Sequence, residues 1–208
     1  MPRLALALEH FKRVDPHFYT ATKKYHASLP GTLSGKKTRA QLFASLVSTV
    51  VSQQLGLAAA DAILSRVKEV CKGRLTPEAV LKARPATLRK AGLSGAKIKT
   101  LKSIARAVKH NSLDLLSLKT VSEAEAAEQL MKIWGLGPWS AEMFLMFALG
   151  RPDVFSPGDL GLIRAMEALY GLPKNAPRPS LLAIAEKWSP HRTYASLLLW
   201  RTRDTKAD

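Results

Sequence analysis

The chain has 208 residues, enough for one large domain or two small lobes that share a cleft, and enough to bury a hydrophobic core. It contains 32 Lys and Arg against 16 Asp and Glu, which gives a formal net charge of +16 and indicates a polyanionic partner. A membrane is disfavoured as that partner, because no apolar run approaches the length of a bilayer span and the start lacks a signal-peptide core. We therefore expect a cytosolic protein that works on nucleic acid.

The single cysteine, Cys71, limits the cofactors that the chain can hold. One thiol excludes an internal disulfide framework, an iron–sulfur cluster held by four cysteines, and a zinc site built mainly from thiolates. Cys71 lies in an apolar stripe with helical spacing, which is typical of a buried structural thiol. We expect no cofactor and no metal site made of side chains.

Apolar residues recur at intervals of three and four along the chain, and no window alternates as a half-buried strand does, so the sequence predicts an all-α fold. The first helix of the core is expected to begin near Arg39 and to end at Gln53-Gln54. After Gly56 a second helix runs to Gly73. Thr76-Pro77-Glu78 has the pattern of an N-cap, a first-turn proline and an acidic first turn, so another helix begins there.

The next pair of helices is joined by a tight turn. Ser122 and Glu125 form a capping box, which predicts a helix from about residue 123 to 133 that stops at Gly135. Trp134-Gly135-Leu136-Gly137-Pro138 then forms a helix-hairpin-helix with the helix that follows it. Two glycines let the backbone turn tightly and present successive N–H groups to an anion, while Leu136 anchors the turn in the core. In a basic chain, this favours a grip on a nucleic-acid backbone over an ordinary interhelical turn.

Charge is also unevenly placed. No acidic residue occurs between Glu78 and Asp114, a stretch that is rich in Lys and Arg. Four basic residues share one face of a predicted helix, and this face is either solvated surface or a surface that meets phosphates. They are Lys99, Lys102, Arg106 and Lys109.

Three blocks of the sequence, in order and spacing, resemble the helix-hairpin-helix (HhH-GPD) DNA glycosylase superfamily, and within it the alkylbase, 3-methyladenine DNA glycosylase II branch. They are Val50–Leu55, Trp134–Ala141 and Asp153–Asp159. A weaker fourth block, Trp188–Ala195, resembles the closing helix. The resemblance implies two helical lobes flanking an active-site cleft. The central lobe spans 39–149, and the second lobe combines 1–38 with 150–208.

The resemblance implies that Asp159 is the catalytic residue. A fixed carboxylate stabilises the oxocarbenium-like sugar that forms when a base departs, and it can orient or deprotonate the attacking water. Read from the local sequence alone, Asp159 is only an N-cap at the start of a helix, preceded by the turn Pro157-Gly158. The two roles are compatible.

For the substrate pocket, the resemblance places Trp139 beside the hairpin, where its indole stacks on a flipped cationic base. The alternative is a core tryptophan that covers the turn. Lyase-competent relatives hold a Schiff-base lysine at this position, so the chain resembles the monofunctional enzymes. Met143 falls where some relatives carry an aromatic pocket residue. His191 is a further candidate, with an ordinary surface histidine as the alternative.

For DNA binding, Gln54 resembles the wedge that fills the gap left by an extruded nucleotide, with Gln53 and Leu55 beside it. The alternative is a polar pair at a helix end. The expected hairpin contacts are Gly135, Leu136, Gly137 and Ser140. The family hairpin often holds a Na⁺ or K⁺ ion through backbone carbonyls, which implies such a site at Trp134 and Leu136.

The sequence thus predicts a monomeric, monofunctional glycosylase that excises alkylated purines such as 3-methyladenine and 7-methylguanine from double-stranded DNA in base excision repair. Its expected location is the cytoplasm, with the nucleoid, in a bacterium, or the nucleus in a eukaryote. One alternative is a non-catalytic module that binds distorted DNA. A bifunctional enzyme for oxidised bases is disfavoured by the absence of the lysine and of cluster cysteines.

Overall fold

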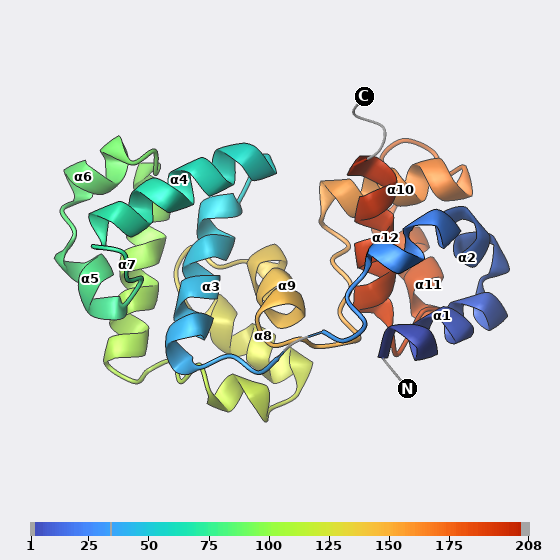
Figure 1. Cartoon of the computed structure of the whole chain (residues 1–208), viewed down its shortest axis with the longest axis horizontal. Helices are drawn as coiled ribbons and strands as arrows, with labels where there is room; N and C mark the ends of the chain where they lie inside the picture. The colour runs from blue at the N-terminus through green and yellow to red at the C-terminus, as the bar shows by residue number, and fades with distance from the viewer. Residues whose placement is uncertain (1–2, 34, 205–208) are drawn as a thin grey trace. The chain divides into compact units, whose positions relative to one another are not determined.

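The computed structural model describes residues 3–33 and 35–204, and within these ranges it contains helices and no β-strand, which confirms the all-α prediction (Figure 1). The chain divides into two compact units. Residues up to Leu33 and residues from Gly150 onward form one, which we call the terminal unit, and residues 34–149 form the other, the central unit. None of the described helices is long and apolar enough to cross a membrane.

The chain passes from the terminal unit to the central unit after Leu33 and returns after Leu149. Lys37 fixes the start of the central unit. Its ammonium donates hydrogen bonds to Ser45 Oγ at 3.0 Å and to the Phe147 carbonyl at 2.8 Å. The Lys37 carbonyl in turn accepts a hydrogen bond from Lys119 Nζ at 2.6 Å. The segment before the first core helix is therefore fixed to the central unit.

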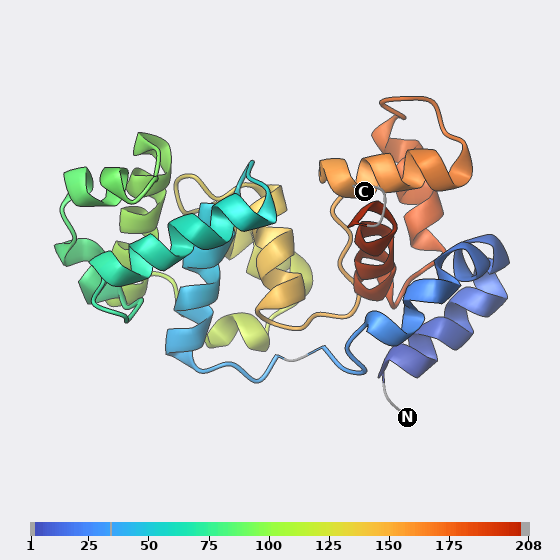
Figure 2. The same cartoon turned by 45° about the horizontal axis from the view of Figure 1, so that its top comes forward.

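In the terminal unit, α12 is surrounded by the other helices (Figures 1 and 2). Tyr194, Ala195, Leu198 and Leu199 on α12 are fully buried. The N-terminal helices pack beside the C-terminal ones. The elements of this unit are α1 (Arg3–Val14), α2 (Pro16–Thr22), the 3-10 helix η1 (Lys23–Ser28), α10 (Leu160–Tyr170), α11 (Arg178–Glu186) and α12 (Arg192–Asp204).

Asp15, a buried carboxylate, links the two ends of the chain in this unit. It caps α2 by accepting a hydrogen bond from Phe18 N at 3.0 Å. Its other oxygen accepts hydrogen bonds from the Tyr170 hydroxyl at 2.6 Å and from Trp188 Nε1 at 3.2 Å. Burial, together with this bond to Asp15, raises the pKa of Tyr170 well above its usual value. The hydroxyl therefore stays protonated and acts as a donor.

In the central unit, α3 packs against α4, α7 and α9 (Figure 1). The caps predicted from sequence are present: Thr76 caps α5, and Ser122 with Glu125 forms the capping box of α8. Cys71 is buried at the end of α4. The elements of this unit are α3 (Arg39–Ser52), α4 (Leu57–Val70), α5 (Pro77–Lys82), α6 (Pro85–Lys90), α7 (Gly95–Lys109), the 3-10 helix η2 (Ser117–Lys119), α8 (Glu123–Met131) and α9 (Pro138–Phe147).

The basic face expected on α7 is present, but one of its members has a structural role. Lys102 Nζ donates hydrogen bonds to the carbonyls of Val80, Leu81 and Ala83 at 3.3, 2.9 and 2.7 Å, and so satisfies the C-terminal carbonyls of α5. Burial, followed by the neighbouring charge of Arg106, lowers the pKa of Lys102. Lys99, Arg106 and Lys109 are exposed.

Candidate functional site

The hairpin between α8 and α9 requires a glycine at position 135. Its backbone φ is +86°, in the left-handed region that favours glycine. A Cβ atom at this position would overlap the side chain of Thr100, on α7. Leu136, next in sequence, is buried and so anchors the turn as predicted. Gly135 thus lets the hairpin pack directly on α7.

Gly137 is a glycine for a different reason. Its φ of −104° and ψ of −176° are accessible to any residue, and an added Cβ would meet no described atom within 4 Å. It is the N-cap of α9, and no side chain caps this helix start. Neither strain nor internal packing therefore requires a glycine at position 137.

Gln53 ties the end of α3 to this hairpin. Its side-chain amide donates hydrogen bonds to Ser140 Oγ at 2.8 Å and to the Gly135 carbonyl at 3.3 Å. Ser140 is buried in the first turn of α9. Among the residues predicted to bind DNA, the structure therefore brings Gln53, Gly135 and Ser140 together, and the contact gives Gln53 and Ser140 a positioning role.

The turn after Gln53 presents the predicted wedge. Gln54 has a φ of +56°, unusual for a residue with a side chain, and both Gln54 and Leu55 are exposed. Lys97 fixes the backbone of this turn, because its Nζ donates hydrogen bonds to the carbonyls of Val51 and Gln53, both at 2.8 Å. Burial lowers the pKa of Lys97. A strained and exposed turn that is held this firmly is typical of a functional loop.

Trp139 and Met143 lie one helical turn apart on α9. Trp139 is half-buried in the first turn, and Met143 is buried. Spacing of four residues places the two side chains on the same face of the helix. Trp134, at the start of the hairpin, is exposed, and Lys99 Nζ lies 4.0 Å from the centre of its ring.

Asp159 caps α10 and is also held by a second helix. Its Oδ1 accepts hydrogen bonds from Leu162 N and from Trp200 Nε1, both at 2.9 Å. A Cβ atom at Gly161 would come within 3.0 Å of both Asp159 Oδ1 and Trp200 Cδ1, so a glycine there lets the indole approach. These contacts fix the position of the carboxylate.

Trp200 is the residue that the sequence analysis missed. It lies 41 positions from Asp159, at the end of an apolar face of α12, and this pattern is typical of a core residue. Only the indole N–H distinguishes it, because a tryptophan at the edge of a core needs a hydrogen-bond acceptor.

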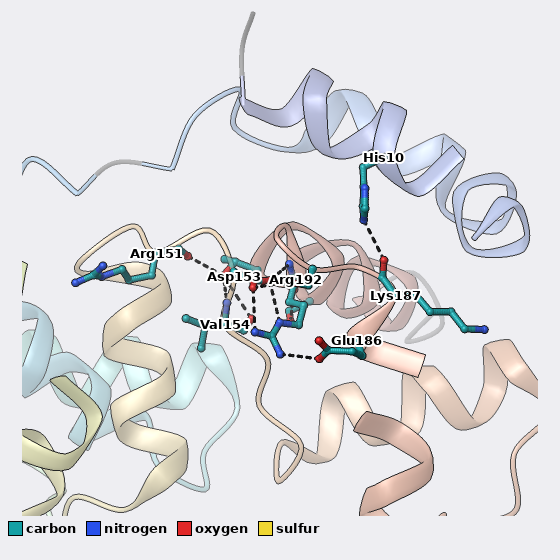
Figure 3. A network of polar contacts seen from close by, with 10 residues as sticks. His10, Arg151, Asp153, Val154, Glu186, Lys187 and Arg192 are labelled. Carbon is teal, nitrogen blue, oxygen red and sulfur yellow. Dashed lines mark hydrogen bonds and ion pairs between the residues drawn. The ribbon is translucent and has the colours of Figure 1, made fainter. Parts of the chain in front are cut away.

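The segment that leads to Asp159 is anchored at Asp153 (Figure 3). Arg192 donates hydrogen bonds to this carboxylate from Nε at 2.8 Å and from a terminal nitrogen at 2.9 Å, and Ser189 Oγ adds one at 2.8 Å. Thr193 Oγ1 bonds the Arg151 carbonyl at 2.7 Å and accepts from Val154 N at 3.0 Å. Burial alone would raise the pKa of Asp153, but the bonds from Arg192 and Ser189 outweigh it and lower the pKa.

His191 immediately precedes α12. Its ring packs edge-on against His10 and Phe11 of α1, with centroid distances of 5.4 and 6.4 Å. Burial, with a contribution from His10, lowers the pKa of His191. These contacts give His191 a packing role against α1.

The predicted site residues fall on both units. Asp159 and His191 belong to the terminal unit. The hairpin, Trp139, Met143 and the turn at Gln54 and Leu55, which we call the wedge turn, belong to the central unit.

Comparisons with known proteins define the family. Residues 47–191 match a protein family described as "HhH-GPD superfamily base excision DNA repair protein". The chain is 36% identical over 196 residues to DNA-3-methyladenine glycosylase 1 of Schizosaccharomyces pombe, which covers 93% of this chain and 85% of that protein. It is 29% identical over 245 residues to the DNA-3-methyladenine glycosylase of Saccharomyces cerevisiae, which covers 98% of this chain and 81% of the relative.

Solved structures agree. The 3-methyladenine DNA glycosylase of S. pombe in complex with abasic DNA superposes with a TM-score of 0.82 at 31% identity, over 95% of this chain and 96% of that one. The DNA-3-methyladenine glycosidase of Bacillus halodurans gives a TM-score of 0.75 at 34% identity, over 95% and 90% of the two chains. The chain belongs to the HhH-GPD superfamily of base excision DNA repair proteins.

The two hairpin glycines should behave differently when each is replaced by alanine. Gly135→Ala should lower the free energy of unfolding by about 3 kcal/mol, because it combines a left-handed backbone with an overlap on Thr100. Gly137→Ala should leave that free energy within about 0.5 kcal/mol of the wild type and should weaken duplex binding. Urea denaturation and fluorescence anisotropy with labelled DNA measure the two effects. Equal stability losses would contradict the assignment.

Asp153→Asn should destabilise the protein in a pH-dependent way. At neutral pH the loss of charged hydrogen bonds should cost about 2 kcal/mol of unfolding free energy. Because the folded-state pKa of Asp153 is lowered, its contribution is complete above the unfolded-state value of about 3.9 and is lost as the pH falls through the folded-state value. The stabilities of the wild type and the variant should therefore converge in acid. Urea denaturation at a series of pH values measures this, and a constant gap would contradict it.

Proposed function

We propose that the chain is a monofunctional DNA glycosylase that hydrolyses the N-glycosidic bond of alkylated purines, such as 3-methyladenine and 7-methylguanine, in double-stranded DNA. The observation that carries the proposal is the fixed Asp159 carboxylate, held by Leu162 N and Trp200 Nε1, in a chain of this superfamily. The named relatives, which are DNA-3-methyladenine glycosylases, support the alkylated substrate.

In this mechanism, the bond between C1′ and the base nitrogen breaks, and its electron pair leaves with the base. Alkylation of a ring nitrogen makes the base cationic and a good leaving group. The Asp159 carboxylate stabilises the positive charge that develops on the sugar, and it orients the water whose oxygen bonds to C1′. The proton of that water passes to the carboxylate and then to solvent. The products are a free base and an intact abasic site.

Recognition of the flipped base is assigned to α9. Trp139 supplies an electron-rich face for a cationic purine, and Met143, one turn later, supplies an adaptable apolar contact. The absence of a lysine at position 139 supports a monofunctional reaction, because no amine is present there to form a Schiff base. We leave His191 out of the proposed pocket and assign it to packing against α1.

The DNA contacts are assigned to the central unit. Gln54 and Leu55 fill the space vacated by the flipped nucleotide, and the backbone at Gly137 meets a phosphate. The backbone carbonyls of Trp134 and Leu136 would hold an alkali-metal ion, which would supply positive charge to that phosphate. We propose that the chain binds DNA as a monomer and in the cellular compartment that holds the genome.

Asp159→Asn should abolish base release while DNA binding persists. With a duplex that contains a single alkylated purine, we expect the single-turnover rate to fall at least a hundredfold, which is roughly the cost of removing one preorganised electrostatic group. Gel analysis after alkali treatment measures release, and omission of alkali tests for lyase activity. Wild-type strand cleavage without alkali would indicate a bifunctional enzyme. Lesion binding without release would favour the non-catalytic module, and full activity of Asp159→Asn would contradict the assigned role.

Trp200→Phe should show that Trp200 positions the Asp159 carboxylate and does not contribute to DNA binding. The phenyl ring retains most of the packing but lacks the N–H that bonds Asp159 Oδ1. Loss of one hydrogen bond to a charged group should lower the single-turnover rate about tenfold. The dissociation constant for the lesion duplex should not change. Gly161→Ala, which pushes the same indole away, should have a similar effect on the rate, and an unchanged rate in Trp200→Phe would remove this residue from the mechanism.

A further inference from the structure

A pocket on the central unit lies outside the hairpin and the wedge turn. It is formed where α6 meets the first three turns of α7, and its volume is about 260 Å³. The lining residues are Pro85, Arg89, Gly95, Ile98, Lys99, Lys102 and Arg106.

The lining of this pocket is basic, with an apolar contribution from Pro85 and Ile98. None of its lining residues is acidic, and the sequence has no acidic residue between Glu78 and Asp114. A guanidinium nitrogen of Arg89 lies 3.9 Å from the position of a Cβ at Gly95, so the Arg89 side chain reaches the first turn of α7. The Lys102 ammonium is fixed by the carbonyls at the end of α5. Positive charge is therefore built into this pocket.

Lys99 joins the pocket to the hairpin. Its side chain lines the pocket, and its Nζ lies 4.0 Å from the ring centre of Trp134. The next residue on the same helix is Thr100, and its side chain lies against the backbone of Gly135. The pocket and the hairpin are thus neighbouring parts of the central unit.

We propose that this pocket binds a phosphodiester group of the same DNA duplex that the hairpin holds, and so extends the DNA-contact surface from the hairpin along α7. The guanidinium groups of Arg89 and Arg106, which line the pocket, can each bond a phosphate through two N–H donors, whereas the apolar Ile98 and Pro85 suit the adjoining sugar. The inference rests on the proposed function only in taking DNA as the ligand, and it assigns no part of the chemistry to the pocket.

The first test compares two charge-matched double variants. Arg89→Gln with Arg106→Gln removes two charges from the pocket, and Lys68→Gln with Lys72→Gln removes two exposed charges at the far end of α4. For a duplex with an abasic analogue, the pocket variant should raise the dissociation constant about tenfold. It should also reduce the slope of log K against log salt concentration by about 0.9, the value for one phosphate contact. The control variant should leave both unchanged. Urea denaturation checks that both variants fold.

The second test locates the phosphate. We measure how tightly the wild type and the pocket variant bind a set of duplexes. Each duplex carries an uncharged methylphosphonate at a different backbone position. At one position outside the hairpin contact, the methylphosphonate should weaken DNA binding by the wild type and should not change DNA binding by the pocket variant. Equal effects at every position, or an unchanged salt slope in the pocket variant, would overturn the proposal. Inhibition by inorganic phosphate that is lost in the pocket variant, without a change in DNA affinity, would indicate a small-anion site instead and would also overturn it.

These outcomes are separate from those of the proposed function. If the wild type releases no base, the glycosylase proposal fails, and the methylphosphonate experiment still reports on the pocket. If base release is normal and the pocket variant binds DNA as tightly as the control, only the pocket proposal fails.

Discussion

The side-chain amide of Gln53 is the contact on which the central unit's candidate DNA surface depends. It joins the end of α3 to the Gly135 carbonyl and to Ser140. Lys97 holds the backbone carbonyls on either side of the same turn, so that the exposed Gln54 keeps a left-handed conformation. The hairpin and the wedge turn are therefore parts of one preorganised surface, and little conformational entropy is lost when this surface binds a ligand. In our account, this rigidity is what allows a nucleotide to be displaced from the stack.

Positive charge in this protein has two uses, and only the structure separates them. Lys37, Lys97, Lys102 and Lys119 donate to backbone carbonyls, mostly where helices end, and burial lowers the pKa of the first three. These lysines stabilise the fold. Others, such as Lys99 and Arg106, line the pocket on α7. The net charge of +16 correctly indicates a polyanionic partner, but it overstates the number of cations that meet that partner.

Local sequence predicted the local structure well. The capping box of Ser122 and Glu125 and the first-turn proline Pro77 each act within a few residues, and the helices that they predict are present. The N-cap role of Asp159 was read in the same way and is confirmed. Contacts between distant residues were not predictable. Trp200 reaches Asp159 across 41 residues, and Gln53 reaches Ser140 across 87. His191, chosen as a pocket residue, packs on α1 because of a neighbour that sequence periodicity does not reveal.

The central claim, that this chain hydrolyses glycosidic bonds to alkylated purines, is tested most directly by mass analysis of the bases that the wild-type protein releases from methylated genomic DNA. The account predicts free 3-methyladenine and 7-methylguanine, in amounts matched by abasic sites in unbroken strands. Release of no base, from DNA that the protein binds, would contradict it.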